Sequence, residues 1–136
     1  MTQQLQLSEQ VEVARHLLGL TGFSRLYRAE DQWGRWVHPR SCRACRFDPE
    51  GALARCSGDN GISPLLLMWM DSCYENRVFQ ALFRRPHDPD RDYPLQEWYG
   101  VATPEALMWF MEVLRDTLQW AETNRCTDKP HLLGHG

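Results

Sequence analysis

Lysine is almost missing from this sequence of 136 residues: Lys129 is the only one, and the other fourteen basic residues are arginines. Arginine has GC-rich codons and lysine does not, so a GC-rich bacterial genome or mobile element is the simplest explanation of this bias. The functional alternative is recognition of carboxylates, phosphates or bases by planar guanidinium groups. The arginines are spread along the chain, which favours the codon explanation. The net charge of −3 argues against a general nucleic-acid-binding protein.

Long apolar runs are missing as well. No stretch approaches the roughly 18 to 20 apolar residues that a membrane span needs. The N-terminal sequence MTQQLQLSEQ lacks the basic start and the apolar centre of a secretory signal. We therefore expect a cytoplasmic protein with no membrane contact. In that reducing compartment an odd number of cysteines, five, predicts free thiols or metal ligands and not a disulfide framework.

Known catalytic motifs are also missing from the sequence. The chain contains no Gly-rich phosphate-binding loop, no HExxH zinc motif and no GxSxG nucleophile motif. A nucleophile also needs a base and an orienting group beside it, and no family pattern surrounds the available cysteine and histidine residues. We therefore expect a protein that is not an enzyme.

What the sequence does contain is an ordinary globular composition, 43% hydrophobic and 24% charged. We predict one α+β domain over residues 1–126 and a flexible C-terminal tail over residues 127–136. The predicted order is helix, antiparallel β-meander of three to four strands, helix, long loop and helix, with the three helices packed on one face of the sheet. The helices span residues 8–21, 63–84 and 103–124, the strands 23–28, 32–38, 42–47 and 52–56, and the loop 86–94.

Local signals set the ends of these helices. Gly22 ends the first one. Ser63 before Pro64, and Thr103 before Pro104, each place a capping hydroxyl ahead of a proline at the first helical position. These two pairs are the clearest helix starts in the chain.

The region from residue 38 to residue 56 holds three of the five cysteines and one histidine. Its single CxxC has the spacing of a zinc knuckle. The zinc ligands would then be Cys42, Cys45, Cys56 and His38, with Cys73 as the alternative fourth ligand. The competing interpretation is that these are reduced structural cysteines, because successive side chains on a strand alternate and Cys42 and Cys45 would face opposite sides. One CxxC does not decide between the two, and a redox pair is a third interpretation.

Residues 23–56 are the basic part of an acidic protein, with seven arginines against four acids. Aromatic residues lie among these arginines, a combination that surfaces binding single-stranded nucleic acid use. In a small sheet, however, aromatic residues more often form the core face and arginines the solvent face. The residues of the nucleic-acid hypothesis are Tyr27, Arg28, Trp33, Arg35, Trp36, Arg43 and Arg46.

The final predicted helix is apolar over a wide arc. One row consists of Leu107, Phe110, Met111, Leu114 and Leu118, and a neighbouring row of Trp109, Val113 and Trp120. A helix at the end of a chain needs only one core face, so the second row either meets another chain or is covered by the rest of the protein. The sequence leaves both possibilities open.

Together these features predict a small, non-enzymatic adaptor or inhibitor that binds a protein partner or a second copy of itself. Tryptophan and arginine are the residues that most often anchor interfaces. The predicted partner-binding residues are Arg28, Trp33, Arg35, Trp36, Arg43, Arg46, Trp109 and Trp120. Two alternatives remain, namely a protein that binds single-stranded nucleic acid through the meander and a small zinc- or thiol-dependent enzyme.

Overall fold

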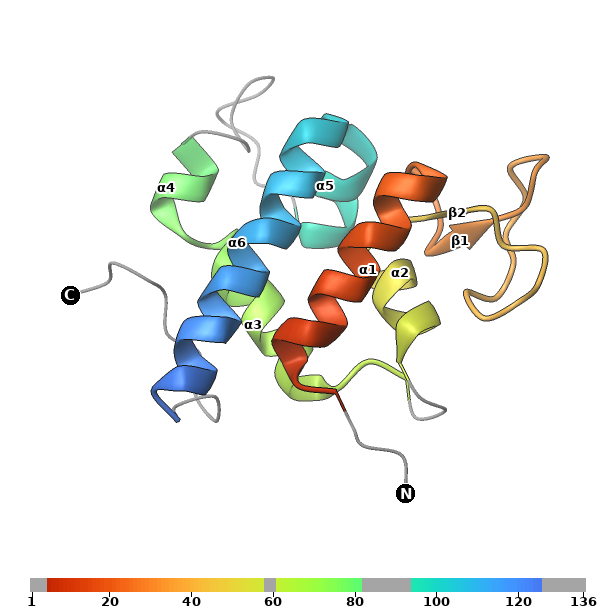
Figure 1. Cartoon of the computed structure of the whole chain (residues 1–136). Helices are drawn as coiled ribbons and strands as arrows, with labels where there is room; N and C mark the ends of the chain where they lie inside the picture. Colours follow the sequence, from red (N-terminus) through yellow and green to blue (C-terminus); the bar gives the residue numbers. More distant parts are fainter. Residues whose placement is uncertain (1–4, 58–60, 82–93, 126–136) are drawn as a thin grey trace.

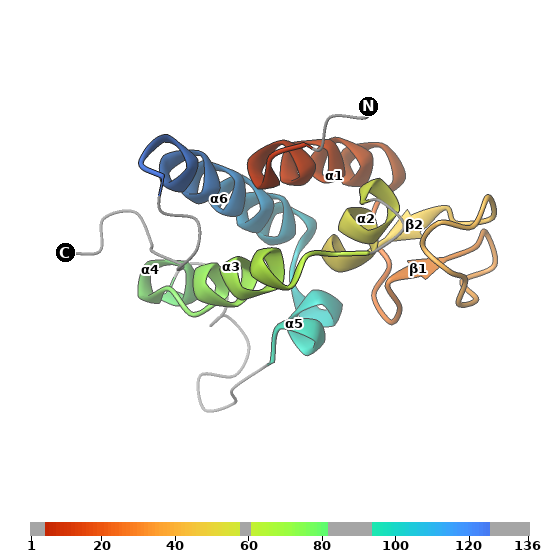
Figure 2. The same cartoon turned by 90° about the horizontal axis from the view of Figure 1, so that it is seen from below.

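The structure is a computed structural model, and it describes residues 5–57, 61–81 and 94–125 (Figure 1). Its helices are α1 (Leu7–Thr21), α2 (Pro49–Cys56), α3 (Pro64–Tyr74), α4 (Arg77–Phe79), α5 (Leu95–Val101) and α6 (Pro104–Thr123), and its strands are β1 (Ala29–Glu30) and β2 (Arg46–Phe47). Helix α1 lies beside α6 and packs against α2 as well (Figure 2). Nearly all of the predicted loop 86–94 and the whole predicted tail 127–136 lie outside the described residues.

The predicted α+β fold with a meander of three to four strands is wrong. Within the described ranges the sheet has two short antiparallel strands, with Ala29 opposite Phe47 and Glu30 opposite Arg46. The predicted strands 23–28 and 32–38 are largely irregular, 42–47 keeps only β2, and 52–56 belongs to α2. These segments do not alternate apolar and polar residues, so a wider sheet would have no apolar face to bury. The helices therefore build the core among themselves.

Residues 48–51, which lie between the predicted strands 42–47 and 52–56, begin helix α2 instead. The Asp48 side chain caps the helix by accepting a hydrogen bond from the Gly51 N–H at 2.6 Å, and Pro49 lies in the first turn. Asp followed by Pro suits a turn and a helix start equally well. The next residues, Ala52 and Leu53, are fully buried. Burial of that apolar face favours the helix.

Two of the predicted helix ends, the start at Pro104 and the end at Gly22, are confirmed. Helix α6 begins at Pro104, and the Thr103 hydroxyl accepts a hydrogen bond from the Ala106 N–H at 3.1 Å. Helix α1 is followed by Gly22, whose φ of 82° is a left-handed value that glycine adopts easily. The first predicted row of α6 is the core row, because its five members are all buried: Leu107, Phe110, Met111, Leu114 and Leu118.

The predicted helix 63–84 begins where expected but is not continuous. Ser63 caps α3 by accepting from the Leu65 N–H at 3.2 Å. The helix ends at Tyr74, and Asn76 starts α4 by accepting from the N–H groups of Val78 and Phe79. An asparagine side chain replaces the helical carbonyl as acceptor here, which is why the helix breaks at this residue.

Helix α5 was not predicted, and it brings Trp98 into an aromatic cluster. The Trp98 ring centroid lies 5.4 Å from that of Tyr74, 5.2 Å from that of Phe79 and 5.7 Å from that of Phe110. The contacts with Phe79 and Phe110 are edge-to-face, and such contacts stabilise a core beyond the area they bury. The cluster joins α3, α4, α5 and α6.

Candidate functional site

Residues 24–45, here called the Trp segment, project from one end of the helical body next to β1 and β2 (Figures 1 and 2). The segment carries Trp33 and Trp36, whose exposed fractions are 68% and 61%. Tyr27 and Leu26 are exposed as well. These aromatic residues were predicted to form either a binding surface or the core face of a sheet. The structure places them on the surface, on an irregular segment.

Three of the four arginines predicted to bind a partner already pair with acids of this chain. Arg28 Nη2 lies 3.0 Å from Glu50 Oε1, and Arg35 Nε lies 3.2 Å from Asp31 Oδ2. Across the small sheet, Arg46 Nε lies 2.5 Å from Glu30 Oε1. The local excess of arginine is therefore largely neutralised by ion pairs inside the segment and with α2.

Other arginines fasten the Trp segment to the body through backbone carbonyls. Arg25 Nη1 donates to the carbonyls of Tyr99 and Ala102 at the end of α5. Arg40 Nη1 donates to the Ser57 carbonyl at 2.9 Å. In the other direction, Arg55 of α2 donates to two carbonyls of the segment, those of Pro39 and Ser41. A cation at the end of a helix satisfies carbonyls that have no partner within that helix.

Trp33 lies on a tight turn that Asp31 builds. Asp31 Oδ1 accepts from the backbone N–H groups of Trp33 and Arg35, each at 2.9 Å. The bond from the Arg35 N–H, followed by that from Trp33, lowers the pKa of Asp31. The Arg35 guanidinium lies over the Trp33 ring, 4.9 Å from its centroid. The orientation of Trp33 is thus set within this protein.

Arg43 differs from the other arginines of the Trp segment. Its side chain is exposed and makes no hydrogen bond or ion pair with any residue that the structure describes. It is therefore the one predicted partner-binding arginine that is free, among the described residues, to meet a partner without breaking a contact.

The structure does not bring the predicted zinc ligands together. Cys42, Cys45 and His38 are exposed, while Cys56 is half-buried. No group of three or more His, Cys, Asp or Glu side chains in residues 5–57, 61–81 and 94–125 is arranged to hold a metal ion. Cys73 is fully buried in α3, and burial raises the pKa of its thiol to about 12. The zinc site remains a prediction from the CxxC spacing.

The competing prediction, in which Cys42 and Cys45 lie on one strand and face opposite sides, does not match the structure either. Cys42 lies in a turn, and Cys45 precedes β2 with its thiol donating to the Arg43 carbonyl at 3.3 Å. The two side chains therefore do not sit on opposite faces of one strand. All four described cysteines are free thiols.

A buried acid cluster at the start of α2 was missed in the sequence. Glu50 is buried, and its carboxylate accepts from Arg28 Nη2 at 3.0 Å and from Gln96 Nε2 at 3.4 Å. Burial raises the pKa of Asp48 to about 7, and the Glu50 charge adds to this effect. Acids in the first turn of a helix are usually exposed, so local sequence contains no signal of this burial.

Tyr99 of α5 completes this acid cluster, defined here as Asp48, Glu50 and Tyr99. Tyr99 is 1% exposed, and its hydroxyl makes no hydrogen bond of ordinary geometry with any described residue. Burial raises the pKa of Tyr99 well above its ordinary value, and the nearby carboxylates of Glu50 and Asp48 raise it further. The cluster can therefore bind or release a proton near neutral pH.

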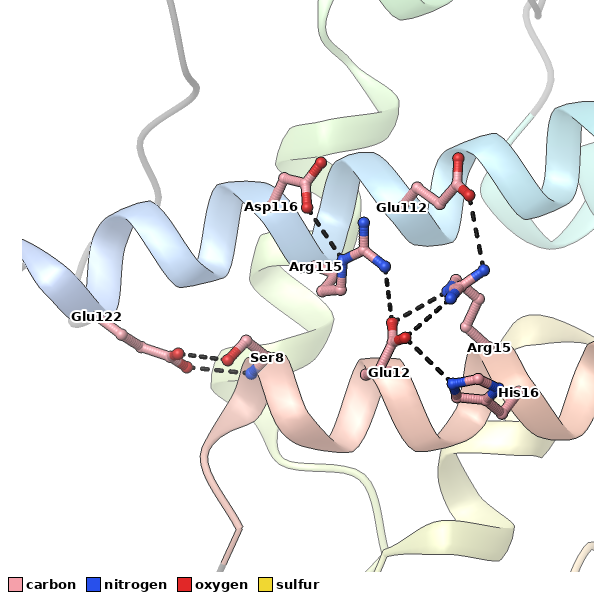
Figure 3. A network of polar contacts seen from close by, with 8 residues as sticks. All are labelled: Ser8, Glu12, Arg15, His16, Glu112, Arg115, Asp116 and Glu122. Atoms are coloured by element: carbon pink, nitrogen blue, oxygen red, sulfur yellow. Dashed lines mark hydrogen bonds and ion pairs between the residues drawn. The ribbon is translucent and has the colours of Figure 1, made fainter.

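A second polar network joins α1 to α6 (Figure 3). Glu12 of α1 binds Arg15 and Arg115, each at 2.8 Å, and Arg15 reaches Glu112 of α6 at 3.6 Å. At the other end of the pair, the Ser8 hydroxyl and N–H donate to the Glu122 carboxylate. Three polar residues of α6, Glu112, Arg115 and Glu122, therefore face α1. This network fixes the two helices antiparallel to each other.

The second apolar row of α6 is mostly covered by the chain itself. Trp109 is half-buried and stacks on Phe79, with ring centroids 5.1 Å apart. Val113 also packs against the core. Trp120 is 39% exposed. Of the two explanations for this row, coverage by the rest of the protein accounts for Trp109 and Val113.

Among the described helices, none is both long and apolar enough to cross a membrane. Comparisons of the chain with models of known protein families, with curated proteins and with solved structures found no match.

Proposed function

We propose that this protein is a non-enzymatic binding protein that contacts a protein partner through the Trp segment. The observation that carries the proposal is the exposure of Trp33 and Trp36, 68% and 61%, on a segment that arginines fasten to the body. Large aromatic side chains that are held in place before binding contribute most to affinity, because little conformational entropy is lost on association.

The charge arrangement favours a protein partner over single-stranded nucleic acid. Arg28, Arg35 and Arg46 each have an acid of this chain within ion-pair distance. If Arg28 turned to a phosphate, the buried Glu50 carboxylate would lose its charged partner, and an unpaired buried charge is costly. Within the described residues Arg43 is the arginine of this group without such a contact. One free cation gives only a weak phosphate-binding surface.

The exposure of the tryptophans favours the Trp segment over α6 as the interface. Trp109 stacks on Phe79, and Val113 packs on the core, so this row of α6 offers less apolar surface than the sequence predicts. Trp33 and Trp36 lie three positions apart in sequence on a projecting segment and are both more exposed than Trp120. A second copy of the chain would therefore also be expected to bind at the Trp segment.

The test compares three forms of the protein as bait in a lysate of the source organism. The wild type and Trp120→Ala should retain the same specific partner, and the double variant W33A/W36A should retain at least about tenfold less of it, because it lacks the anchor side chains. Far-UV circular dichroism and thermal unfolding establish that all three are folded. Equal retention by the double variant would contradict the proposal.

A second measurement separates the two classes of partner. Binding of a labelled single-stranded oligonucleotide is measured from about 50 to about 500 mM salt, since phosphate contacts weaken steeply over such a range. We expect negligible oligonucleotide binding and a protein complex that resists salt. Micromolar oligonucleotide affinity that depends on Trp33 and Trp36 would replace the protein partner with nucleic acid.

A further inference from the structure

The Trp segment is fastened to the first turn of α2 through Arg28. The Arg28 carbonyl accepts from the Asp48 N–H at 3.1 Å, and its guanidinium binds Glu50 at 3.0 Å. Gly51 packs directly on the same residue, since a Cβ at Gly51 would lie 1.6 Å from the Arg28 carbonyl oxygen. Arg28 immediately precedes β1. Any change in the first turn of α2 is therefore passed to the segment that carries Trp33.

The acid cluster sits at this junction. Asp48 accepts from the Gly51 N–H at 2.6 Å, and Glu50 from Arg28 and Gln96. The Tyr99 hydroxyl is buried beside them and makes no hydrogen bond of ordinary geometry with any described residue. Arg28 pairs with Glu50 only, so a second buried carboxylate nearby repels Glu50 when both are ionised. Burial raises the pKa of Asp48 to about 7, so this group changes its charge near neutral pH.

The titratable and charged groups around Asp48 come from each neighbouring element. Glu50 belongs to its own helix, Arg28 to the Trp segment and Tyr99 to α5, while Asp71 of α3 acts on Tyr99. Arg46 of β2 is engaged by Glu30. The buried residues of α1, which also packs on α2, do not titrate: Ser8, Val11, Ala14 and Leu18. Among the charged groups, Glu50 and Arg28 therefore have the main influence on the protonation of Asp48.

We propose that the acid cluster is a proton-controlled anchor that sets how firmly the Trp segment is held on the body. With a proton on Asp48, Glu50 alone pairs with Arg28, and the contacts at the start of α2 are intact. When Asp48 releases this proton to solvent, the second buried charge favours opening of the first turn of α2. The segment then opens more often, and a partner that needs it ordered binds less tightly. The last step rests on the proposed function, whereas the earlier steps do not.

The experiment follows backbone amides by NMR from about pH 5 to about pH 9. The Gly51 amide shift reports on Asp48, because this N–H donates to the Asp48 carboxylate. Hydrogen-exchange protection, corrected for the intrinsic pH dependence, reports on the anchor through the Asp48 amide and on the segment through the Cys45 amide, which donates to the Glu30 carbonyl at 2.8 Å. The Leu114 amide in α6 is the internal reference.

We expect the chemical shift of the Gly51 amide to change with a midpoint near neutral pH. Above that midpoint the exchange protection of the Asp48 and Cys45 amides should fall about tenfold, while that of the Leu114 amide stays unchanged. Asp48→Asn keeps a capping side chain without a titrating charge, so it should abolish both effects. Tyr99→Phe should shift the pH midpoint of the Gly51 shift change, and the loss of exchange protection should shift with it. A Gly51 titration without any change in protection, or no titration at all, would overturn the proposal. None of these measurements involves a partner, so their failure is distinct from a failure of the proposed function.

Discussion

At the scale of single residues, Gly51 is the position where the backbone leaves no room for a side chain. A Cβ there would lie 1.6 Å from the Arg28 carbonyl oxygen and 2.5 Å from its carbonyl carbon. Both are backbone atoms held by the small sheet and by the Asp48 N–H. The Arg28 carbonyl group cannot move away without breaking a hydrogen bond. Glycine is therefore required at position 51 by the close approach of the Arg28 backbone and not by its φ angle.

The substitution Gly51→Ala should therefore destabilise the protein by more than about 3 kcal/mol, or prevent folding. Urea unfolding followed by circular dichroism measures the change. Gly19→Ala is the matched control, because Gly19 lies in α1 with nothing within 4 Å of the added Cβ. There alanine should stabilise by roughly 0.5–1 kcal/mol through helix propensity. Similar effects of the two substitutions would contradict the close approach.

Asp48 gives a second prediction at this scale. Its pKa is about 7 in the folded protein and 3.8 in the absence of perturbation, so the folded state binds this proton more tightly than the unfolded state. The resulting stabilisation is complete below pH 3.8 and is lost as the pH rises to about 7. Asp48→Asn should remove this loss and raise stability at alkaline pH by on the order of 2 kcal/mol.

Urea unfolding at several pH values tests this prediction. The curve of unfolding free energy against pH should slope downward between about pH 4 and about pH 7 for the wild type and be flatter for the variant. The control is Glu105→Gln, at an exposed acid of the first turn of α6. Parallel curves for wild type and Asp48→Asn would show that the Asp48 carboxyl titrates as an ordinary exposed acid.

At the scale of the elements, the α1–α6 pair depends on one carboxylate. Glu12 accepts from Arg15 and from Arg115, and these bonds, Arg15 first, lower its pKa from 4.5 to about 2 (Figure 3). A lowered pKa stabilises the fold above pH 4.5, and this stabilisation is lost as the pH falls toward 2. The network is partly exposed, so solvent screening reduces its contribution to about 1 kcal/mol.

Glu12→Gln should therefore lower the thermal stability of the protein at neutral pH and make it less sensitive to acid between about pH 4.5 and about pH 2. Thermal unfolding at about pH 7 and at about pH 2, with and without added salt, measures both effects. Added salt should reduce the difference between wild type and variant. A difference of the same size at both pH values would mean that packing, and not the charge of Glu12, joins the helices.

At the scale of the whole molecule, the six tryptophans fall into two classes. Trp69 and Trp98 are buried and Trp109 is half-buried, whereas Trp33, Trp36 and Trp120 are exposed, the first two of them on the Trp segment. A projecting, pre-ordered segment that exposes large aromatic side chains on a helical core is typical of a binding surface. The arginines that sequence analysis assigned to partners mainly hold this segment in place.

Quenching of tryptophan fluorescence by iodide tests this division. The double variant W33F/W36F should lose most of the quenchable emission and keep the buried, blue-shifted emission, because its remaining exposed indole is that of Trp120. Thermal unfolding should change little, since surface side chains contribute little to stability. Quenchable emission that survives the double substitution would place these two indoles in the interior.

Short-range chemistry in the sequence was sufficient to predict some elements. Thr103 with Pro104 and Ser63 with Pro64 start helices as expected, because capping involves only groups within one turn. Gly22 follows α1 for a similar reason. The core row of α6 also follows from the helical period alone.

The meander was wrong because the residues that support the Trp segment are distant in sequence. Arg25 contacts the end of α5, and Arg28 contacts Glu50 of α2. Without these contacts, a stretch rich in aromatic residues and arginine resembles strands. The Asp48-Pro49 pair was ambiguous between a turn and a helix start, and burial of Leu53 resolved it.

The sequence by itself determined where α3 and α6 begin, where α1 ends and which row of α6 is apolar enough to be buried, because these properties depend on neighbours along the chain. Only the tertiary structure decided that the arginines brace a projecting segment and that Asp48, Glu50 and Tyr99 share a buried site. Burial and ion pairing depend on which elements meet in space. The two features that carry the proposed function and its control by protons therefore arise from packing.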